Sequence, residues 1–303
     1  MPTITSLDEL VQTYLSSPLP IWEIIKRANG KRSFSPPPKK TKRRAAKKRP
    51  TVPEVAWEAA WVQHRTYIFE ETGEEMPYAL FVPPAPAPPR RCPLLLALHG
   101  HNYPYDWAMG IDGLLAFATK HAMLVVAPLG YTKTGWYGAP CLPRRGRVTD
   151  EGRRSEADVL SVLRLVREEF EVDATRCFAW GFSAGGSGAL HFALKQPGLF
   201  RGIGLVAPAI GAAPSMLPPD GLPPWTQNAE LGTLAHTAVA VVYGTHDHAV
   251  DTEMTRGVVD DFRRAGVSRL LEVEVAGGEH DCEALTAEGV LERMLKHMWQ
   301  GCG

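Results

Sequence analysis

Residues 177–186 read Cys-Phe-Ala-Trp-Gly-Phe-Ser-Ala-Gly-Gly, and this stretch decides the predicted fold. An apolar run ends in Gly181-Phe182-Ser183-Ala184-Gly185, and a helical pattern follows it. This order predicts a buried strand, a sharp turn with a serine at its tip, and a helix that begins behind that serine. Glycines two residues before and two residues after Ser183 keep side chains out of the tight turn. The motif indicates a nucleophilic serine, although ordinary glycine-rich turns also contain such pentapeptides.

A serine hydroxyl becomes a nucleophile only when a base takes its proton and a third group orients that base. Asp247 follows the apolar run 239–243, and His280 follows the strand-like run 270–275. We therefore expect Ser183 as nucleophile, Asp247 as acid and His280 as base, which is the chain order of α/β-hydrolases. The alternatives are a helix-capping role for Asp247 and a surface position for His280. Asp251 is a second candidate for the helix cap, which leaves Asp247 available to an imidazole.

The sequence His99-Gly100-His101-Asn102 follows another apolar run, residues 94–98. A carbonyl attacked by serine becomes an oxyanion, which needs fixed N–H donors, and we expect these from the backbones of His101 and Ala184. The histidines here and in His246-Asp247-His248 also suggest metal binding. Two ligands so close in sequence need further ligands from elsewhere, and the sequence indicates none, so we expect neither a metal nor a cofactor.

Strand-like and helix-like segments alternate from about residue 55 to the end of the chain, and most of the strands are continuously apolar. That pattern is typical of a sheet buried on both faces, so we predict an α/β fold with a mostly parallel central sheet and helices on both faces. The expected strands are 58–70, 76–82, 94–98, 122–128, 176–181, 202–209, 239–243 and 270–275. The expected helices are 111–121, 155–169, 184–194, 250–264 and 284–298.

From about residue 60 to residue 300, these motifs resemble the α/β-hydrolase superfamily. Residues 78–84, 93–100, 173–176, 181–186 and 244–247 are similar to its esterase branch, with polyhydroxyalkanoate depolymerases, feruloyl esterases and dienelactone hydrolase-like proteins. The resemblance implies a triad of Ser183, Asp247 and His280, with oxyanion N–H groups at His101 and Ala184. The chain departs from that branch at His101, where a glycine run is common, and at Phe182, where His or Met is common.

The Pro-rich segment 211–236 lies between two predicted strands and is too short for a separate domain. We expect it to form a short lid and, together with residues 131–147, the wall of the substrate pocket. Ordinary packing is the alternative for each pocket candidate, and these candidates are Asn102, Trp136, Tyr137, Phe182 and Trp225.

The N-terminal region differs sharply in charge from the rest of the chain. Residues 1–50 hold twelve Lys or Arg and three Asp or Glu, which gives a net charge of about +9. We expect a helical segment at 1–30, a flexible basic Pro-rich linker at 31–53 and a catalytic domain at 54–303. The basic segment 31–50 is either a solvated linker or a contact for an anionic partner, which can be nucleic acid, an anionic membrane or an acidic protein.

The composition of this 303-residue chain agrees with one large core. Its five cysteines form no Cys-x-x-Cys pair, and neither a secretory signal nor an 18-residue apolar stretch is evident, so we expect a cytoplasmic protein. The expected function is hydrolysis of small carboxylic esters through an acyl-enzyme. The alternatives are a thioesterase or peptidase of the same fold, and a tethering protein with an inert hydrolase body.

Overall fold

The computed structural model describes residues 61–84, 91–139, 150–210 and 231–300. The predicted N-terminal helix and basic linker, the segment 211–230 and Trp225 lie outside these ranges. The described elements belong to the unit Trp61–Gly303.

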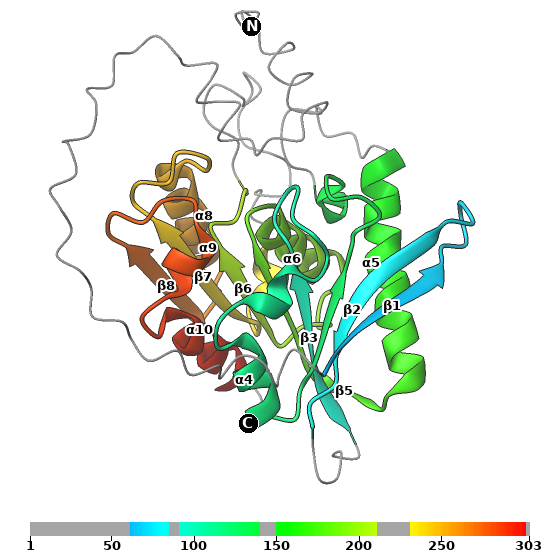
Figure 1. The fold of residues 1–303 in the computed structure, drawn as a ribbon. Coiled ribbons are helices and arrows are strands. Elements are labelled where there is room, and N and C mark those ends of the chain that lie inside the picture. The colour runs from blue at the N-terminus through cyan, green and yellow to red at the C-terminus, as the bar shows by residue number, and fades with distance from the viewer. Residues whose placement is uncertain (1–60, 85–90, 140–149, 211–230, 301–303) are drawn as a thin grey trace, which may run out of the picture. The chain divides into compact units, whose positions relative to one another are not determined.

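An eight-stranded sheet forms the centre of this unit, in the order β1-β2-β4-β3-β5-β6-β7-β8 (Figure 1). β1 pairs with β2 and β2 with β4 in antiparallel fashion, and all other neighbours are parallel. The predicted α/β fold with a mostly parallel sheet is therefore confirmed. The strands are β1 (Val62–Ile68), β2 (Glu75–Phe81), β3 (Cys92–Leu98), β4 (Leu124–Pro128), β5 (Val172–Phe182), β6 (Gly202–Val206), β7 (Ala238–Gly244) and β8 (Leu270–Val275).

β3 marks the point where the order of the strands reverses. β3 pairs with β4 on one side and with β5 on the other, so the chain leaves β3 and β5 in opposite directions across the sheet. In open parallel sheets, ligands bind outside the carboxyl ends of the strands at such a switch point. The predicted site residues that follow β3, β5, β7 and β8 therefore converge on one edge.

Helices cover both faces of the sheet and bury two separate apolar clusters. One face packs against α5 (Asp150–Glu169), α6 (Ala184–Lys195) and α8 (Thr252–Arg264). The other face packs against α4 (Leu114–Lys120), α9 (Cys282–Thr286) and α10 (Val290–Trp299). β3 is apolar throughout because its alternate side chains enter both clusters: Leu94, Leu96 and Leu98 on one face, Leu95 and Ala97 on the other. Short 3-10 turns occur at η1 (Trp107–Gly110), η2 (Trp136–Gly138) and η5 (Gly232–Leu234).

Two predicted helices differ from the structure. The single helix expected at 284–298 is wrong: α9 and α10 are separated by Glu288 and Gly289, which have φ angles of 52° and 82°. Left-handed residues cannot continue a right-handed helix. α5 begins at Asp150 rather than near residue 155, and the polar residues of its first turn escape a search for apolar periodicity. Within the described ranges, no helix is long and apolar enough to cross a membrane.

Candidate active site

Ser183 occupies the turn between β5 and α6 with φ 54° and ψ −116°, a conformation that costs a non-glycine residue free energy. Its N–H donates to the Val206 carbonyl at 2.8 Å, which fixes the turn against β6. A Cβ at Gly181 would lie 2.2 Å from the Gly185 carbonyl oxygen, and a Cβ at Gly185 would lie 2.0 Å from the Leu98 carbonyl oxygen. Both glycines are therefore needed because backbone approaches backbone at the serine turn.

Ser183, His280 and Asp247 lie in one hydrogen-bonded row. The Ser183 Oγ lies 3.0 Å from His280 Nε2, and His280 Nδ1 lies 2.7 Å from Asp247 Oδ2. An ionised carboxylate only accepts, so Nδ1 holds the proton and Nε2 is left to accept the serine proton. The side chain of Asp247 is 2% exposed and that of His280 is 11% exposed, so water competes little for these bonds.

The loops after β7 and β8 bring the acid and the base together. The His246 N–H donates to the Gly278 carbonyl at 2.8 Å, and a Cβ at Gly244 would lie 2.1 Å from the Gly278 oxygen. Asp247 Oδ1 accepts the N–H groups of Ala249 and Val250, each at 2.8 Å, which orients the carboxylate.

The helix cap of α8 comes from a different carboxylate. Asp251 accepts the Met254 N–H at 3.1 Å. The cap that the sequence offered as an alternative role for Asp247 is therefore occupied by Asp251. Asp247 Oδ2 remains available to the imidazole.

The two predicted oxyanion donors belong to the N-terminus of α6 and to the loop after β3. Ala184 is the first residue of α6, and N–H groups in the first turn of a helix have no acceptor within that helix. The partial positive charge of a helix N-terminus also favours a developing oxyanion. His101 lies in the loop after β3, where the Asn102 N–H donates to the Lys133 carbonyl at 2.9 Å. Asn102 itself has a φ of 68°, so this loop turns sharply.

The His101 side chain is buried and its imidazole lies 5.7 Å from the Trp136 ring, measured between centroids. Burial, together with the neighbouring His99, lowers the pKa of His101 to about 4. The imidazole is therefore neutral near pH 7. Trp136, a predicted pocket residue, is half-buried against the imidazole of the predicted oxyanion donor His101.

Phe182, another predicted pocket residue, is 1% exposed and lies against the base. Its ring centroid is 4.8 Å from that of His280, with the planes 35° apart. Tyr103 and Trp107 pack against the other parts of the Phe182 ring at centroid distances of 6.1 and 5.6 Å. Tyr103 and Trp107 were not among the predicted site residues, because no pattern of spacing in the sequence marks them.

Tyr137 does not lie at a pocket wall as predicted. Its side chain is 2% exposed and belongs to the buried cluster shared by α5 and α6. Its hydroxyl donates to the His99 carbonyl at 3.0 Å. The Tyr137 ring lies in the interior because Gly130 and Gly188 leave room for it there.

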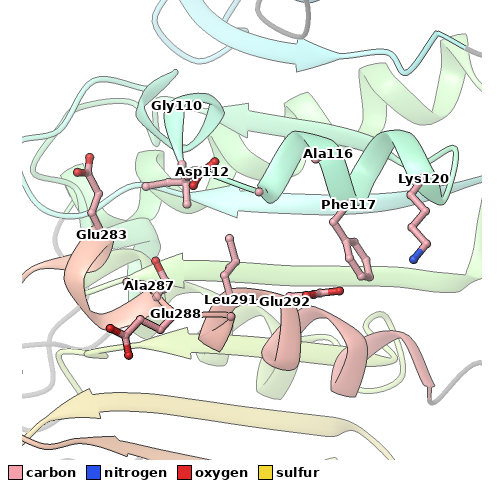
Figure 2. Close-up of a pocket in the computed structure, with 14 residues that line it drawn as sticks. Gly110, Asp112, Ala116, Phe117, Lys120, Glu283, Ala287, Glu288, Leu291 and Glu292 are labelled. Atoms are coloured by element: carbon pink, nitrogen blue, oxygen red, sulfur yellow. The ribbon is translucent and has the colours of Figure 1, made fainter. Parts of the chain in front are cut away.

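A hollow lies between α4 and the α9–α10 corner, with a volume of about 640 Å³ (Figure 2). Four carboxylates line it, those of Asp112, Glu283, Glu288 and Glu292, together with apolar residues. Ser183, Asp247 and His280 are not among its lining residues, so this hollow is separate from the candidate active site. No group of three or more His, Cys, Asp or Glu side chains in the described ranges is placed to hold a metal ion.

Comparison with known proteins identifies the family of this chain. The model of the Esterase family matches residues 70–284. S-formylglutathione hydrolase from Rattus norvegicus is 25% identical over 224 residues, which cover 66% of this chain and 76% of the relative.

Two solved structures share the fold. An S-formylglutathione hydrolase from Agrobacterium tumefaciens aligns with a TM-score of 0.61 at 18% identity, covering 80% of this chain and 95% of that one. A thermostable esterase aligns with a TM-score of 0.56 at 19% identity, covering 78% of this chain and 63% of that one. The family match over residues 70–284 and the α/β-hydrolase sheet show that this chain belongs to the Esterase family, and it is a carboxylic ester hydrolase.

Proposed function

We propose that this esterase cleaves its substrate through a Ser183–His280–Asp247 triad and a covalent acyl-enzyme. The observation that supports this most directly is the unbroken row of contacts, 3.0 Å from Ser183 Oγ to His280 Nε2 and 2.7 Å from His280 Nδ1 to Asp247 Oδ2. These distances are within the range required of a nucleophile, a base and an orienting acid.

In the first half-reaction, His280 Nε2 takes the hydroxyl proton as Ser183 Oγ bonds to the ester carbonyl carbon. Asp247 stabilises the imidazolium that forms. The N–H groups of Ala184 and His101 donate to the oxyanion of the tetrahedral intermediate. The intermediate collapses, the C–O bond to the alcohol breaks, and the alcohol leaves with the proton from Nε2.

In the second half-reaction, a water molecule attacks the acyl carbon and gives its proton to His280. The tetrahedral intermediate again places its negative charge between the same two N–H groups. Collapse breaks the bond to Ser183 Oγ, which recovers the proton, and the carboxylic acid leaves.

A thioester is the second candidate substrate, because the rat relative is an S-formylglutathione hydrolase. The same attack expels a thiolate in place of an alkoxide, and the triad needs no additional group for it. Parallel assays with an oxygen ester and a thioester of the same acyl group distinguish the two: a kcat/KM at least tenfold higher for one of them identifies the leaving group that the site prefers.

The experiment that tests the proposal compares Ser183→Ala with Ser187→Ala on p-nitrophenyl acetate. Ser187 is a matched control because it lies one turn further along α6 and is buried, and its hydroxyl donates to the Ser183 carbonyl at 3.5 Å rather than to the imidazole. We expect Ser183→Ala to lower kcat by a factor of about 10⁴ to 10⁶ and Ser187→Ala to leave it within a few-fold of wild type. Equal turnover by Ser183→Ala and wild type would refute the proposal.

A further inference from the structure

Three consecutive residues near the site adopt left-handed backbone conformations. Trp136, Tyr137 and Gly138 have φ angles of 56°, 58° and 77°. Glycine adopts this region freely, but two aromatic L-residues in succession do not. Strain of this kind persists only where the surrounding structure holds it, and it is concentrated at functional sites.

The surrounding structure holds Tyr137 from two sides. Its ring fills a space that exists only because of glycines: a Cβ would lie 2.6 Å from the ring at Gly188 and 2.7 Å from it at Gly130. The Tyr137 N–H donates to Ser155 Oγ on α5 at 2.9 Å. The phenol therefore has a fixed position between α5 and α6.

The segment around Gly130 is itself anchored to α5. The N–H groups of Gly130 and Tyr131 donate to Asp158 Oδ2 at 2.7 and 3.0 Å. Asp158 is fully buried, and its other oxygen accepts the Tyr67 hydroxyl at 2.6 Å. The segment that presents Tyr137 is thus a rigid support.

From this support the phenol reaches the oxyanion loop, residues 99–102 after β3. Tyr137 Oη donates to the His99 carbonyl at 3.0 Å, and the His99 ring packs edge-on against the phenol with centroids 5.5 Å apart. Three residues later, the Asn102 N–H donates to the Lys133 carbonyl at 2.9 Å. One hydrogen bond therefore lies on each side of His101, and both come from the segment 130–138.

We propose that Tyr137 is a positioning residue: its hydroxyl, through the His99 carbonyl, holds the His101 N–H where the oxyanion forms. This inference rests on the proposed triad mechanism. An oxyanion donor acts only within about 2.7–3.1 Å of the oxygen that becomes charged. A small displacement of the loop therefore weakens transition-state binding more than it weakens binding of the neutral ester.

The test uses the full-length protein and compares Tyr137→Phe with Tyr243→Phe. Both tyrosines are 2% exposed, and the Tyr243 hydroxyl lies within hydrogen-bond distance of Glu272 and Glu274 on β8 rather than of the loop after β3. We expect Tyr137→Phe to lower kcat for p-nitrophenyl acetate about tenfold to hundredfold, a part of the loss seen when an oxyanion donor is removed. KM should stay within about threefold, because ground-state binding is little affected.

A second measurement reports the oxyanion position itself. Phenylboronic acid forms a tetrahedral adduct with a reactive serine, so its Kd should rise in Tyr137→Phe by a factor similar to the fall in kcat. Tyr243→Phe should change neither quantity. Should Tyr137→Phe not fold, Ser155→Ala is measured in the same way, because it removes the acceptor of the Tyr137 N–H.

The possible failures are distinguishable. If Tyr137→Phe, or Ser155→Ala in its place, matches Tyr243→Phe in kcat and in boronate affinity, the positioning role is wrong. A rise in KM by the same factor as the fall in kcat would also overturn it, because the variant would then bind the neutral ester less well too. If wild type fails to turn over the ester, or is not labelled at Ser183 by a fluorophosphonate, the triad proposal itself fails.

Discussion

Replacing Asp247 with Asn changes one atom of the site and reverses the proton arrangement of the base. Asp247 Oδ1 accepts two backbone N–H groups, and Oδ2 accepts the His280 Nδ1–H at 2.7 Å. An asparagine retains the two backbone bonds only by keeping its oxygen at the Oδ1 position. Its NH₂ group then faces His280 and donates to Nδ1, so the ring proton moves to Nε2.

The size of the effect follows from that tautomer. A protonated Nε2 cannot accept the proton of Ser183 Oγ, which lies 3.0 Å away. Loss of the base through the wrong tautomer lowers kcat by a factor of about 10⁴ in a serine hydrolase of known mechanism, which corresponds to about 5.4 kcal/mol of barrier. The backbone bonds survive, so we expect the free energy of unfolding to change by less than about 1 kcal/mol.

Initial rates with p-nitrophenyl acetate and thermal unfolding measure the two quantities. Asp251→Asn is the control, because Asp251 only caps α8 and asparagine caps a helix as well as aspartate does. A folded Asp247→Asn with kcat within about tenfold of wild type would refute the orienting role. A collapse of thermal stability would show that Asp247 acts mainly as a structural cap.

The remaining predictions concern the packing around the triad. Phe182→Leu removes the aromatic face beside His280 and should lower kcat about twofold to thirtyfold through lost cation–π stabilisation of the imidazolium. The control is Phe178→Leu, from the same strand, and equal kcat values for the two variants would contradict this. Gly185→Ala places a Cβ 2.0 Å from the Leu98 oxygen, so we expect at least a tenfold lower kcat and a lower Tm, and wild-type values of both would show that the turn relaxes. The pKa of His101 is about 4 in the folded protein against 6.5 normally, so its contribution to stability is present above pH 6.5 and is lost as the pH falls toward 4. His101→Gln should therefore lose less Tm than wild type between pH 7 and pH 4.5, and parallel Tm curves would contradict that.

The sequence was sufficient to predict that Ser183, Asp247 and His280 would lie together, because each follows a strand that the sequence pattern marks. Ser183 and Asp247 follow the apolar runs of β5 and β7, His280 follows the partly apolar β8, and parallel strands end at one edge of the sheet. Chain order alone therefore predicted which side chains would meet.

The role of Tyr137 could not be predicted in this way. Its position depends on Gly130 and Gly188, which lie far apart in the sequence and are ordinary glycines until their Cβ distances to the ring are known. The break between α9 and α10 was also hidden, because Glu288 has no sequence feature that announces a left-handed conformation. The cytoplasmic location and the anionic partner of residues 31–50 stay predictions.

Labelling with a fluorophosphonate, followed by peptide mass spectrometry, tests the central claim most directly. The reagent phosphonylates a serine only when a base activates it, and Ser183 is the residue that the structure places 3.0 Å from His280 Nε2. We predict one adduct per chain, on Ser183, with labelling abolished in Ser183→Ala and strongly slowed in Asp247→Asn. An adduct on another serine, or no adduct on folded protein that hydrolyses p-nitrophenyl acetate, would contradict the account.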